Sequence, residues 1–380
     1  MTISCETAPK LYVFNSKKSM LIGTDANEAN LTPNLVGINE YAFNLLHALY
    51  ELKTSHTFVI YLKTPPRSDL PPQRPNWHYR VIPFPGFWTQ TRLPWDLYTH
   101  RPRPDVFFSM THYAPRWSPV PTVVAIMDLG FLRSPEQFTA KDFNQLKSWT
   151  SYSIRQATRV IAISEYTKQE IIKTYNVSPA AITVTPLAYD QKLFKPTTDA
   201  SVLLKYGISK PYILFLGSLK PNKNVEGLIR AFYSLEPKTY NLVIAGKKAW
   251  LYDSIIKLAK DRVVFTGFVD SRDKPALMSQ AAAFIMPSFF EGFGIPVLEA
   301  MACGTSVVIS DVASLPEVGG DATIYVDPHD PKSIAQGIID ATGPERGRWV
   351  KKGLERVKLF SWATCAQLTL KCLETATAKS

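Results

Sequence analysis

The second half of the chain alternates short apolar runs with helical patterns, and this alternation constrains the fold more than any other feature. The apolar runs lie at 212–218, 240–247, 262–269, 282–288, 305–310 and 322–327, and the helical patterns at 224–235, 251–260, 272–281, 296–303 and 331–341. Short apolar strands that alternate with helices predict a parallel sheet with helices on both faces. We therefore predict a doubly wound α/β domain in this half.

The first half shows the same alternation less regularly. Strands are predicted at 19–24, 57–62, 78–83, 105–110, 121–127, 159–164 and 182–186, and helices at 38–52, 140–157 and 165–175. Because 380 residues exceed what one core usually serves, we predict two Rossmann-like domains, 1–188 and 189–360, and a C-terminal helix within 361–380. Ligands bind beyond the carboxyl ends of parallel strands, so the cleft between the domains is the expected site.

The chain carries 43 Lys and Arg against 32 Asp and Glu, which gives a net charge of +11. Such a surplus fits an anionic ligand, an anionic membrane surface or nucleic acid. The sequence has no zinc-finger or aromatic RNA-binding signature, so nucleic acid is not an expected partner. The six histidines and four cysteines show no metal-ligand spacing, and we expect neither a metal nor a cofactor.

No apolar run reaches the ~18–20 residues of a membrane span, and the N-terminus lacks a secretory signal. These observations predict a cytoplasmic protein with reduced thiols.

Segment 63–117 differs from the rest of the chain in composition. It contains eleven prolines, eight Lys or Arg and three acidic residues. Because proline interrupts helices, we predict loops around short strands. A solvated connector is one interpretation. The other is a surface for an acceptor or a membrane, since Trp88, Arg92, Trp95, Arg101 and Arg103 suit a polyprenyl-diphosphate acceptor at an anionic inner-membrane face.

The stretch PSFFEGFGIPVLEAMACG (287–304) is typical of a strand end, a loop and a short helix. Pro296 at the first helical position and Gly304 past the last one mark the helix boundaries. Gly292 and Gly294 let a ligand approach the loop backbone closely. Free N–H groups at a helix N-terminus suit a phosphate or diphosphate.

Two glutamates in this stretch, Glu291 and Glu299, lie eight positions apart. Eight helical residues span ~12 Å, whereas a retaining glycosidase needs its two carboxylates ~5–5.5 Å apart. The spacing therefore suits an extended ligand with hydroxyl groups at both ends and a diphosphate between them, such as a nucleotide sugar. Two solvated glutamates are the alternative. A second loop, GSLKPNKN (217–224), adds Lys220 and Lys223, which are either surface charges or partners of the diphosphate.

Together these motifs resemble the donor domain of family 4 retaining glycosyltransferases. The two glutamates match that family's E-x7-E motif, and GINEYAFNLL and VIAISEYTKQEI resemble its N-terminal domain. The resemblance covers nearly the whole chain and implies a GT-B fold, that is, two Rossmann-like domains facing across a cleft. It also implies that the C-terminal helix within 361–380 crosses back onto the first domain.

The resemblance also implies roles for matched residues. Glu291, Lys223 and Asp128 would be catalytic, with Lys223 neutralising the diphosphate that leaves. Glu299 would bind the ribose and Val269 would lie beside the base. The complete set of implied donor-binding residues is Gly37, Ser218, Lys220, Val269, Gly292, Phe293, Gly294, Ile295 and Glu299. The sequence departs from the family at Asn222 and Ser218, where arginine is usual, at Asn39, where glycine is usual, and at Met127, where histidine is usual.

We therefore expect a retaining transfer of a hexose from a nucleotide sugar, UDP-linked in our first interpretation, to a glycan or polyprenyl-linked acceptor. No metal is needed in this scheme, and the nucleotide sugar is a substrate rather than a cofactor. The alternatives are a mannosyltransferase that uses GDP-mannose, a sugar-nucleotide epimerase or phosphorylase, and a catalytically silent nucleotide-sugar binder. A cytoplasmic protein with peripheral contact to the inner membrane face is the expected setting.

Overall fold

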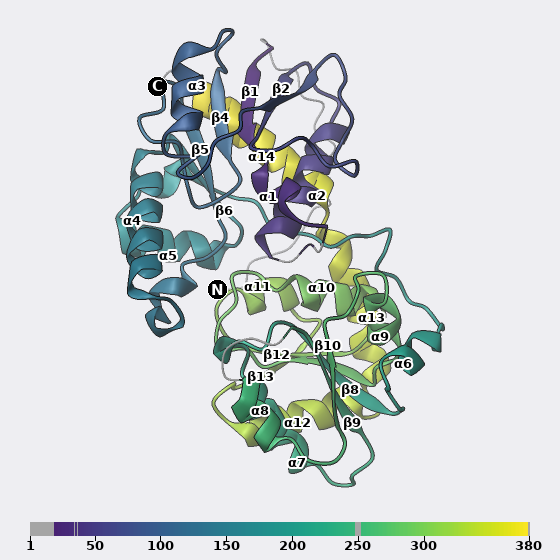
Figure 1. The fold of residues 1–380 in the computed structure, drawn as a ribbon. Helices are drawn as coiled ribbons and strands as arrows, with labels where there is room; N and C mark the ends of the chain where they lie inside the picture. The colour runs from purple at the N-terminus through teal and green to yellow at the C-terminus, as the bar shows by residue number, and fades with distance from the viewer. Residues whose placement is uncertain (1–18, 34, 36, 248–251, 379–380) are drawn as a thin grey trace.

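The computed structural model describes residues 19–33, 35, 37–247 and 252–378. Figure 1 shows two α/β domains, one above the other, each built around a sheet. Within the described residues, the first sheet has seven strands in the order β3-β2-β1-β4-β5-β6-β7, and the second has six in the order β10-β9-β8-β11-β12-β13. All of these strand pairs are parallel, which confirms the predicted α/β class with two doubly wound sheets.

The first sheet is covered by helices on both faces. Its strands are β1 (Leu21–Asp25), β2 (Thr57–Leu62), β3 (Trp77–Val81), β4 (Val106–Ser109), β5 (Thr122–Ile126), β6 (Arg159–Ala162) and β7 (Ile182–Val184). Successive side chains point to opposite faces, so the buried rings of Phe107 and Phe108 enter different cores. The Phe108 side holds α2 (Ile38–Glu51) and α14 (Trp362–Thr377), and the other holds α3 (Arg92–Thr99), α4 (Ala140–Gln156) and α5 (Glu165–Tyr175).

The second sheet follows the same plan. Its strands are β8 (Tyr212–Leu216), β9 (Asn241–Ala245), β10 (Val263–Gly267), β11 (Ala283–Met286), β12 (Val307–Ser310) and β13 (Ile324–Val326). One face packs on α9 (Lys274–Gln280), α10 (Ile295–Ala302) and α11 (Leu315–Gly319), and the other on α7 (Val225–Tyr233), α8 (Tyr252–Leu258) and α12 (Pro331–Thr342). The helix α13 (Arg346–Arg356) lies against α10 and α12.

Five of the described helices were not predicted. Three of them, α1 (Asn27–Leu31), α6 (Ser201–Lys205) and α11, have five residues each, too few to show a helical period. The helix α13 is mostly polar, and α3 lies in the proline-rich segment for which only loops and strands were predicted. Pro94 fits in α3 because it occupies the first turn, where a backbone N–H has no helical partner to lose.

Trp88 corrects a second prediction for the proline-rich segment. Its side chain is 1% exposed and packs with Leu93, Leu97 and Phe107 under α3, so it is a core residue and not part of a membrane-facing surface. Its indole N–H donates to the carbonyl oxygen of Ile82 at 2.8 Å, which satisfies the one polar atom of the buried ring.

The last described helix, α14, belongs to the first domain by its packing. It lies against α2 and strands β4 to β7 and buries Cys365, Leu370 and Leu373. A carboxylate oxygen of Glu374, on α14, lies 3.0 Å from Nε2 of His56, the residue directly before β2. Three cysteines of the described chain, Cys303, Cys365 and Cys372, are free thiols in the core, whereas Cys5 lies outside the described residues. In the described part of the chain, no helix combines the length and the hydrophobicity that crossing a bilayer requires.

The two domains touch through the N-terminus of α5. The Glu317 carboxylate, from α11, accepts hydrogen bonds from the backbone N–H groups of Glu165 and Tyr166 at 2.7 and 2.6 Å. These amides belong to the first turn of α5, so a carboxylate of one domain interacts favourably with the positive end of a helix in the other. The contact joins α5, which follows β6 of the first sheet, to α11, which follows β12 of the second.

Candidate active site

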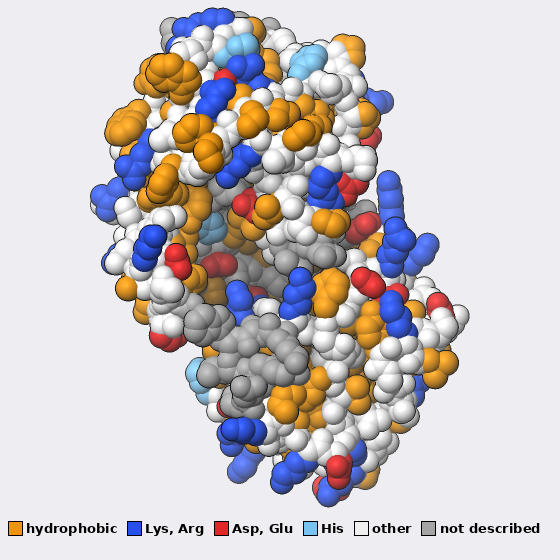
Figure 2. Space-filling view, in the orientation of Figure 1, with side chains coloured by type: hydrophobic (Ala, Val, Ile, Leu, Met, Phe, Trp, Pro, Cys, Tyr) orange, Lys and Arg blue, Asp and Glu red, His pale blue; other side chains and the backbone are white. Residues whose placement is uncertain are grey.

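The loops that follow the strands of both sheets line a hollow between the domains. Figure 2 shows this hollow, with acidic, basic and histidine side chains in it. The loop 217–224 follows β8, the loop 287–294 follows β11, and Asp128 follows β5 of the other domain. We call the second of these, 287–294, the donor loop. Carboxyl ends of parallel strands are where ligands of such sheets bind.

Lys223 and Glu291 form an ion pair in this hollow. The Lys223 Nζ lies 2.5 and 2.7 Å from the two carboxylate oxygens of Glu291. The Ser288 hydroxyl donates to the same carboxylate at 2.7 Å. The two side chains are mostly buried, at 17% and 10% exposed, yet each keeps a surface toward solvent. Such a pair can receive a ligand with a negative group beside the ammonium and hydroxyl groups beside the carboxylate.

Asn222 holds the two loops of this ion pair together. Its carbonyl oxygen accepts a hydrogen bond from the Phe289 N–H at 2.8 Å, and its amide Nδ2 donates to the carbonyl oxygen of Phe290 at 3.2 Å. The buried Ser314 hydroxyl supports the donor loop from behind by donating to the carbonyl oxygen of Glu291 at 2.8 Å. The asparagine at a position where the family usually has arginine therefore positions the loop in this chain.

The donor loop reaches the first domain at Gly292. A Cβ at this position would lie 2.8 Å from the carbonyl oxygen of Met127 and 2.9 Å from the Cβ of Asp128, closer than real contacts allow. The Ser164 hydroxyl donates to the Gly292 carbonyl at 3.0 Å, and Asp128 accepts the Gly130 N–H at 2.7 Å. Glycine therefore lets Asp128 of one domain and Glu291 of the other border the same space.

The donor loop also presents backbone N–H groups. Within the described residues, those of Gly292, Phe293 and Gly294 donate to no protein acceptor. Gly294, at φ 107°, then leads into the first turn of α10. The ring centroids of Phe293 and Phe360 lie 6.0 Å apart, so the Phe293 side chain is packed in the protein and its backbone N–H is the group that can bind a ligand. Unpaired amides at a helix N-terminus form a site for an anion or for hydroxyl oxygens.

Glu299 lies deeper, on α10. It is 1% exposed, and no hydrogen bond in the described chain ties it to Glu291 or Lys223. Burial, the largest effect, raises the pKa of Glu299 to about 8; the positive charge of Lys274 opposes this rise, and the charges of Glu40 and Asp190 add to it. Glu40 comes from α2 of the first domain, so charges from both domains act on this carboxyl group.

The remaining predicted donor-binding residues differ in how exposed they are. Lys220 and Gly37 are exposed, Ser218 is half-buried, and Val269 and Ile295 are buried. Gly37 has φ 55° at the start of α2, a left-handed conformation that favours glycine. The described residues contain no group of three or more His, Cys, Asp or Glu that could hold a metal ion.

His112 is a residue that the sequence did not single out. Its Nε2 lies 3.3 Å from the carbonyl oxygen of Asp128, and burial lowers the pKa of the imidazole while Asp128 opposes that change. One feature of the sequence could have pointed to His112: it lies three residues after the strand 106–109. It is therefore at the carboxyl edge of the first sheet, where Asp128 was also expected. Met127, by contrast, packs in the hydrophobic core of the first domain.

Comparison with known proteins decides the family. Residues 205–354 match the family described as Glycosyl transferases group 1, and residues 36–193 match Glycosyltransferase Family 4. O-antigen chain mannosyltransferase B of Escherichia coli is 32% identical over 261 residues, which cover 65% of this chain and 68% of that protein. The chain belongs to glycosyltransferase family 4.

Solved structures similar to this glycosyltransferase share its fold. Sucrose-phosphate synthase from Thermosynechococcus elongatus has a TM-score of 0.74 at 18% identity, covering 95% of this chain and all of that one. Anabaena Alr3699/HepE in complex with UDP-glucose has a TM-score of 0.71 at 17% identity, covering 94% of this chain and all of that one. The predicted GT-B fold of this glycosyltransferase is confirmed.

Proposed function

We propose that this glycosyltransferase moves a hexose from a nucleotide sugar to a glycan or lipid-linked saccharide with retention of the anomeric configuration, in polysaccharide or glycoconjugate synthesis. One observation carries the proposal: the Lys223–Glu291 ion pair lies beside three unpaired loop amides at the N-terminus of α10. A diphosphate needs positive charge and N–H donors, and a sugar needs a carboxylate for its hydroxyl groups. The donor loop offers the N–H donors and the carboxylate, and Lys223 of the neighbouring loop 217–224 offers the positive charge.

The reaction follows from these roles. The bond between the anomeric carbon and the diphosphate oxygen breaks, and the negative charge that develops on that oxygen is stabilised by Lys223 and the loop amides. The acceptor hydroxyl attacks the anomeric carbon from the same face, and its proton passes to the departing phosphate oxygen. Asp128 and Glu291 border the sugar from opposite domains and orient it.

The donor is the first thing to test. UDP-sugars come first, because Alr3699/HepE was solved with UDP-glucose, and GDP-mannose comes second, because a relative is a mannosyltransferase. A thermal-shift screen against nucleotide sugars identifies the donor. An assay for acceptor-dependent nucleotide release then separates a transferase from an epimerase or a phosphorylase. Donor binding without turnover on any acceptor would leave the silent binder as the better description.

Two variants test the assigned roles with that donor. Lys223→Ala should cost on the order of 2–4 kcal/mol of transition-state stabilisation, because it removes charge from the departing diphosphate. Glu299→Ala should weaken binding of the free nucleotide, because a ribose contact is present in the ground and transition states alike. Calorimetry that shows normal nucleotide binding by Glu299→Ala would rule out the ribose assignment.

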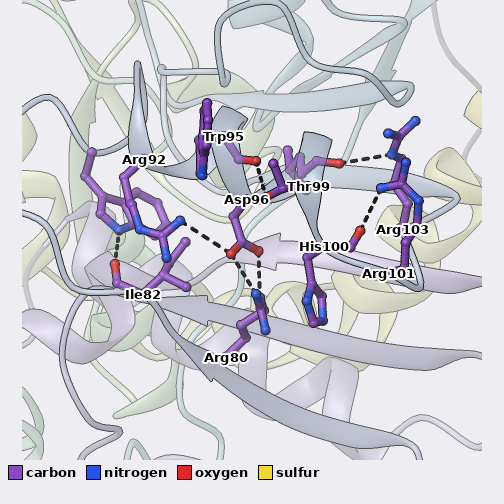
Figure 3. Close-up of polar contacts among 11 residues, drawn as sticks. Arg80, Ile82, Arg92, Trp95, Asp96, Thr99, His100, Arg101 and Arg103 are labelled. Carbon is purple, nitrogen blue, oxygen red and sulfur yellow. Dashed lines mark hydrogen bonds and ion pairs between the residues drawn. The ribbon is translucent and has the colours of Figure 1, made fainter.

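We also propose a peripheral membrane contact through α3 and the residues after it. Figure 3 shows that the Asp96 carboxylate forms ion pairs with two arginines. Its oxygens lie 2.6 and 2.7 Å from Nε and Nη2 of Arg80, and one lies 3.5 Å from Nη1 of Arg92. Arg101 and Arg103 instead donate to backbone carbonyls at the end of α3, and neither forms an ion pair with a carboxylate of the described residues. Segment 63–117 has eight basic and three acidic residues, 8 − 3 = +5.

Exposed aromatic side chains accompany this charge. Trp95 is 67% and Tyr98 48% exposed on α3. Figure 2 shows hydrophobic and basic side chains mixed over the upper part of the molecule, where α3 lies, with few acidic ones. Interfacial aromatic rings and basic side chains favour an anionic bilayer surface. The setting that we propose is therefore the cytoplasm, at the inner membrane face.

Vesicle sedimentation tests the membrane contact. Binding to phosphatidylglycerol vesicles should fall as salt rises to the physiological level, because exposed charges are then screened. The double variant Arg101→Gln/Arg103→Gln should bind less at low salt, and Trp95→Ala should bind less at every salt level. Equal binding to neutral phosphatidylcholine vesicles, or none at low salt, would make segment 63–117 a solvated connector.

A further inference from the structure

Three aromatic side chains form a continuous strip on the first domain. The ring centroids of Tyr113 and Trp149 lie 5.3 Å apart, and those of Trp149 and Phe87 lie 6.2 Å apart. Tyr113 follows β4, Trp149 lies on α4, and Phe87 precedes α3, so three elements that are separate in sequence supply one surface. We call these three residues the aromatic strip.

The inner end of the aromatic strip meets the candidate active site. Tyr113 adjoins His112, whose Nε2 lies 3.3 Å from the carbonyl oxygen of Asp128. Burial raises the pKa of the Tyr113 hydroxyl, and the negative charge of Glu28 adds to this rise. Glu28 itself accepts a hydrogen bond from the Asn39 amide at 2.7 Å.

The position of these polar residues in the sheet is also informative. Glu28 follows β1 and Tyr113 follows β4, and these two strands are neighbours. From β1 the strand order runs outward to β2 and β3 on one side and through β4 to β7 on the other. Crevices at such switch points are where open parallel sheets bind their ligands. The aromatic strip therefore leads outward from a place suited to a ligand.

The outer end of the aromatic strip is strained and exposed. Phe87 has φ 43°, a left-handed conformation that phenylalanine rarely adopts, and its side chain is 67% exposed. Such a backbone conformation is unfavourable for a side chain like phenylalanine and is often found at binding sites. An exposed ring gains little packing energy in return. The Phe87 carbonyl oxygen accepts the N–H groups of Gln90 and Thr91 at 2.9 Å just before α3, so its backbone has a role in the fold. Its ring stays exposed and can contact a ligand.

We propose that the aromatic strip binds an acceptor saccharide of several sugar residues, with its terminal sugar at Glu28 and His112 and its preceding sugars on Trp149 and Phe87. The proposal rests on the proposed glycosyl transfer and deepens it by naming the acceptor class. A pyranose ring has an apolar face of C–H groups that packs on an aromatic ring, while its hydroxyl groups need acceptors and donors at the edge. Glu28 supplies an acceptor, and so does Nδ1 of His112, because Nε2 of His112 donates to the carbonyl oxygen of Asp128.

A bilayer is the competing partner for an exposed Phe87, and the polar inner end of the strip argues against it. Glu28 would repel an anionic lipid surface, whereas it would accept hydrogen bonds from a sugar. Arg116 is close in sequence to Tyr113, and its Nε donates a hydrogen bond to the side-chain oxygen of Gln90 at 2.8 Å. Its guanidinium group is therefore already engaged by a neutral side chain. The contact of Trp95 and Tyr98 with a membrane, proposed above, involves other residues of segment 63–117.

Direct binding of oligosaccharides tests the proposal without requiring turnover. The probes are α-mannotetraose with methyl α-mannoside, and maltotetraose with methyl α-glucoside, titrated calorimetrically in the presence of UDP. At least one tetrasaccharide should bind the wild type tenfold or more tightly than the matching methyl glycoside, because only the longer chain reaches Trp149 and Phe87.

Phe87→Gly is the decisive variant, because it removes the ring and relieves the positive φ at once. It should keep or raise the melting temperature, weaken tetrasaccharide binding at least threefold, and leave methyl glycoside binding unchanged. Trp149→Ala should weaken tetrasaccharide binding further. Trp95→Ala, an exposed aromatic residue outside the strip, is the matched control and should bind all four probes normally.

Three results would overturn the proposal. The first is that neither tetrasaccharide binds more tightly than its glycoside. The second is full tetrasaccharide affinity in Phe87→Gly. The third is a loss of vesicle binding by Phe87→Gly with saccharide binding unchanged, which would assign the ring to the membrane. Tetrasaccharide binding that is retained in a protein without transferase activity would instead reject the proposed glycosyl transfer and leave the saccharide site standing.

Discussion

At the scale of single residues, Glu299 combines deep burial with a carboxyl group that has no hydrogen-bond partner in the described chain. Its pKa rises from 4.5 to about 8 on folding, so the folded protein holds a proton that the unfolded chain releases. The stability that this proton contributes is complete below about pH 4.5 and is lost as the pH rises through 8. The group therefore disfavours folding in mildly alkaline solution.

Glu299→Gln should remove this pH dependence. Between pH 5 and pH 8 the wild type should lose on the order of a few kcal/mol of unfolding free energy that the variant keeps. Urea denaturation at several pH values measures the difference. Glu236→Gln, at an exposed carboxyl group, is the control and should follow the wild type. Parallel stability curves for wild type and Glu299→Gln would contradict the expected titration.

Gly292 gives a second prediction at this scale. An added Cβ would press on Met127 and Asp128, so Gly292→Ala should push the donor loop from the first domain and cost about 1–3 kcal/mol. We expect kcat/KM to fall at least tenfold while each domain stays folded. The control is Gly347→Ala on α13, where no atom lies within 4 Å of the new Cβ. That change should leave activity intact and stabilise the helix slightly.

At the scale of elements, the sequence predicted every described strand, because continuous apolar runs between helices are a strong signal. It also predicted the loop and helix around Glu291 and Glu299, whose glycines and proline mark their boundaries. It missed α3, because proline at a first turn cannot be distinguished from proline in a loop. It missed the contact of His112 with Asp128, because which way a side chain points at a strand end depends on tertiary contacts.

The helix α14 allows a prediction for a whole element. Leu373 is fully buried against the first domain, so Leu373→Ala should cost about 2–5 kcal/mol of unfolding free energy. Chemical denaturation followed by circular dichroism measures the loss. Leu359→Ala, at a side chain that is 53% exposed, should change stability by less than about 0.5 kcal/mol. Equal effects of the two changes would show that α14 does not stabilise the first domain.

At the scale of the whole molecule, the first domain brings Asp128 to the hollow and the second domain brings the Lys223–Glu291 ion pair. Lys223, the loop amides and the N-terminus of α10 supply positive charge for a diphosphate from protein groups alone. Transferase activity should therefore survive excess EDTA, measured as nucleotide release with the best donor. Loss of activity that only manganese or magnesium restores would show that the reaction depends on a divalent ion.

The packing of α14 also bears on how the protein is made. The last strand of the first sheet ends at Val184, and α14 begins at Trp362, so 362 − 184 = 178 positions separate them. A ribosome adds roughly 5–20 residues per second, so the nascent first domain waits on the order of ten to forty seconds for the helix that completes its core. During that interval the Phe108 side of the sheet lacks part of its cover. The domain synthesised first is therefore completed last, and its exposed apolar face is a natural substrate for chaperones that act on the nascent chain.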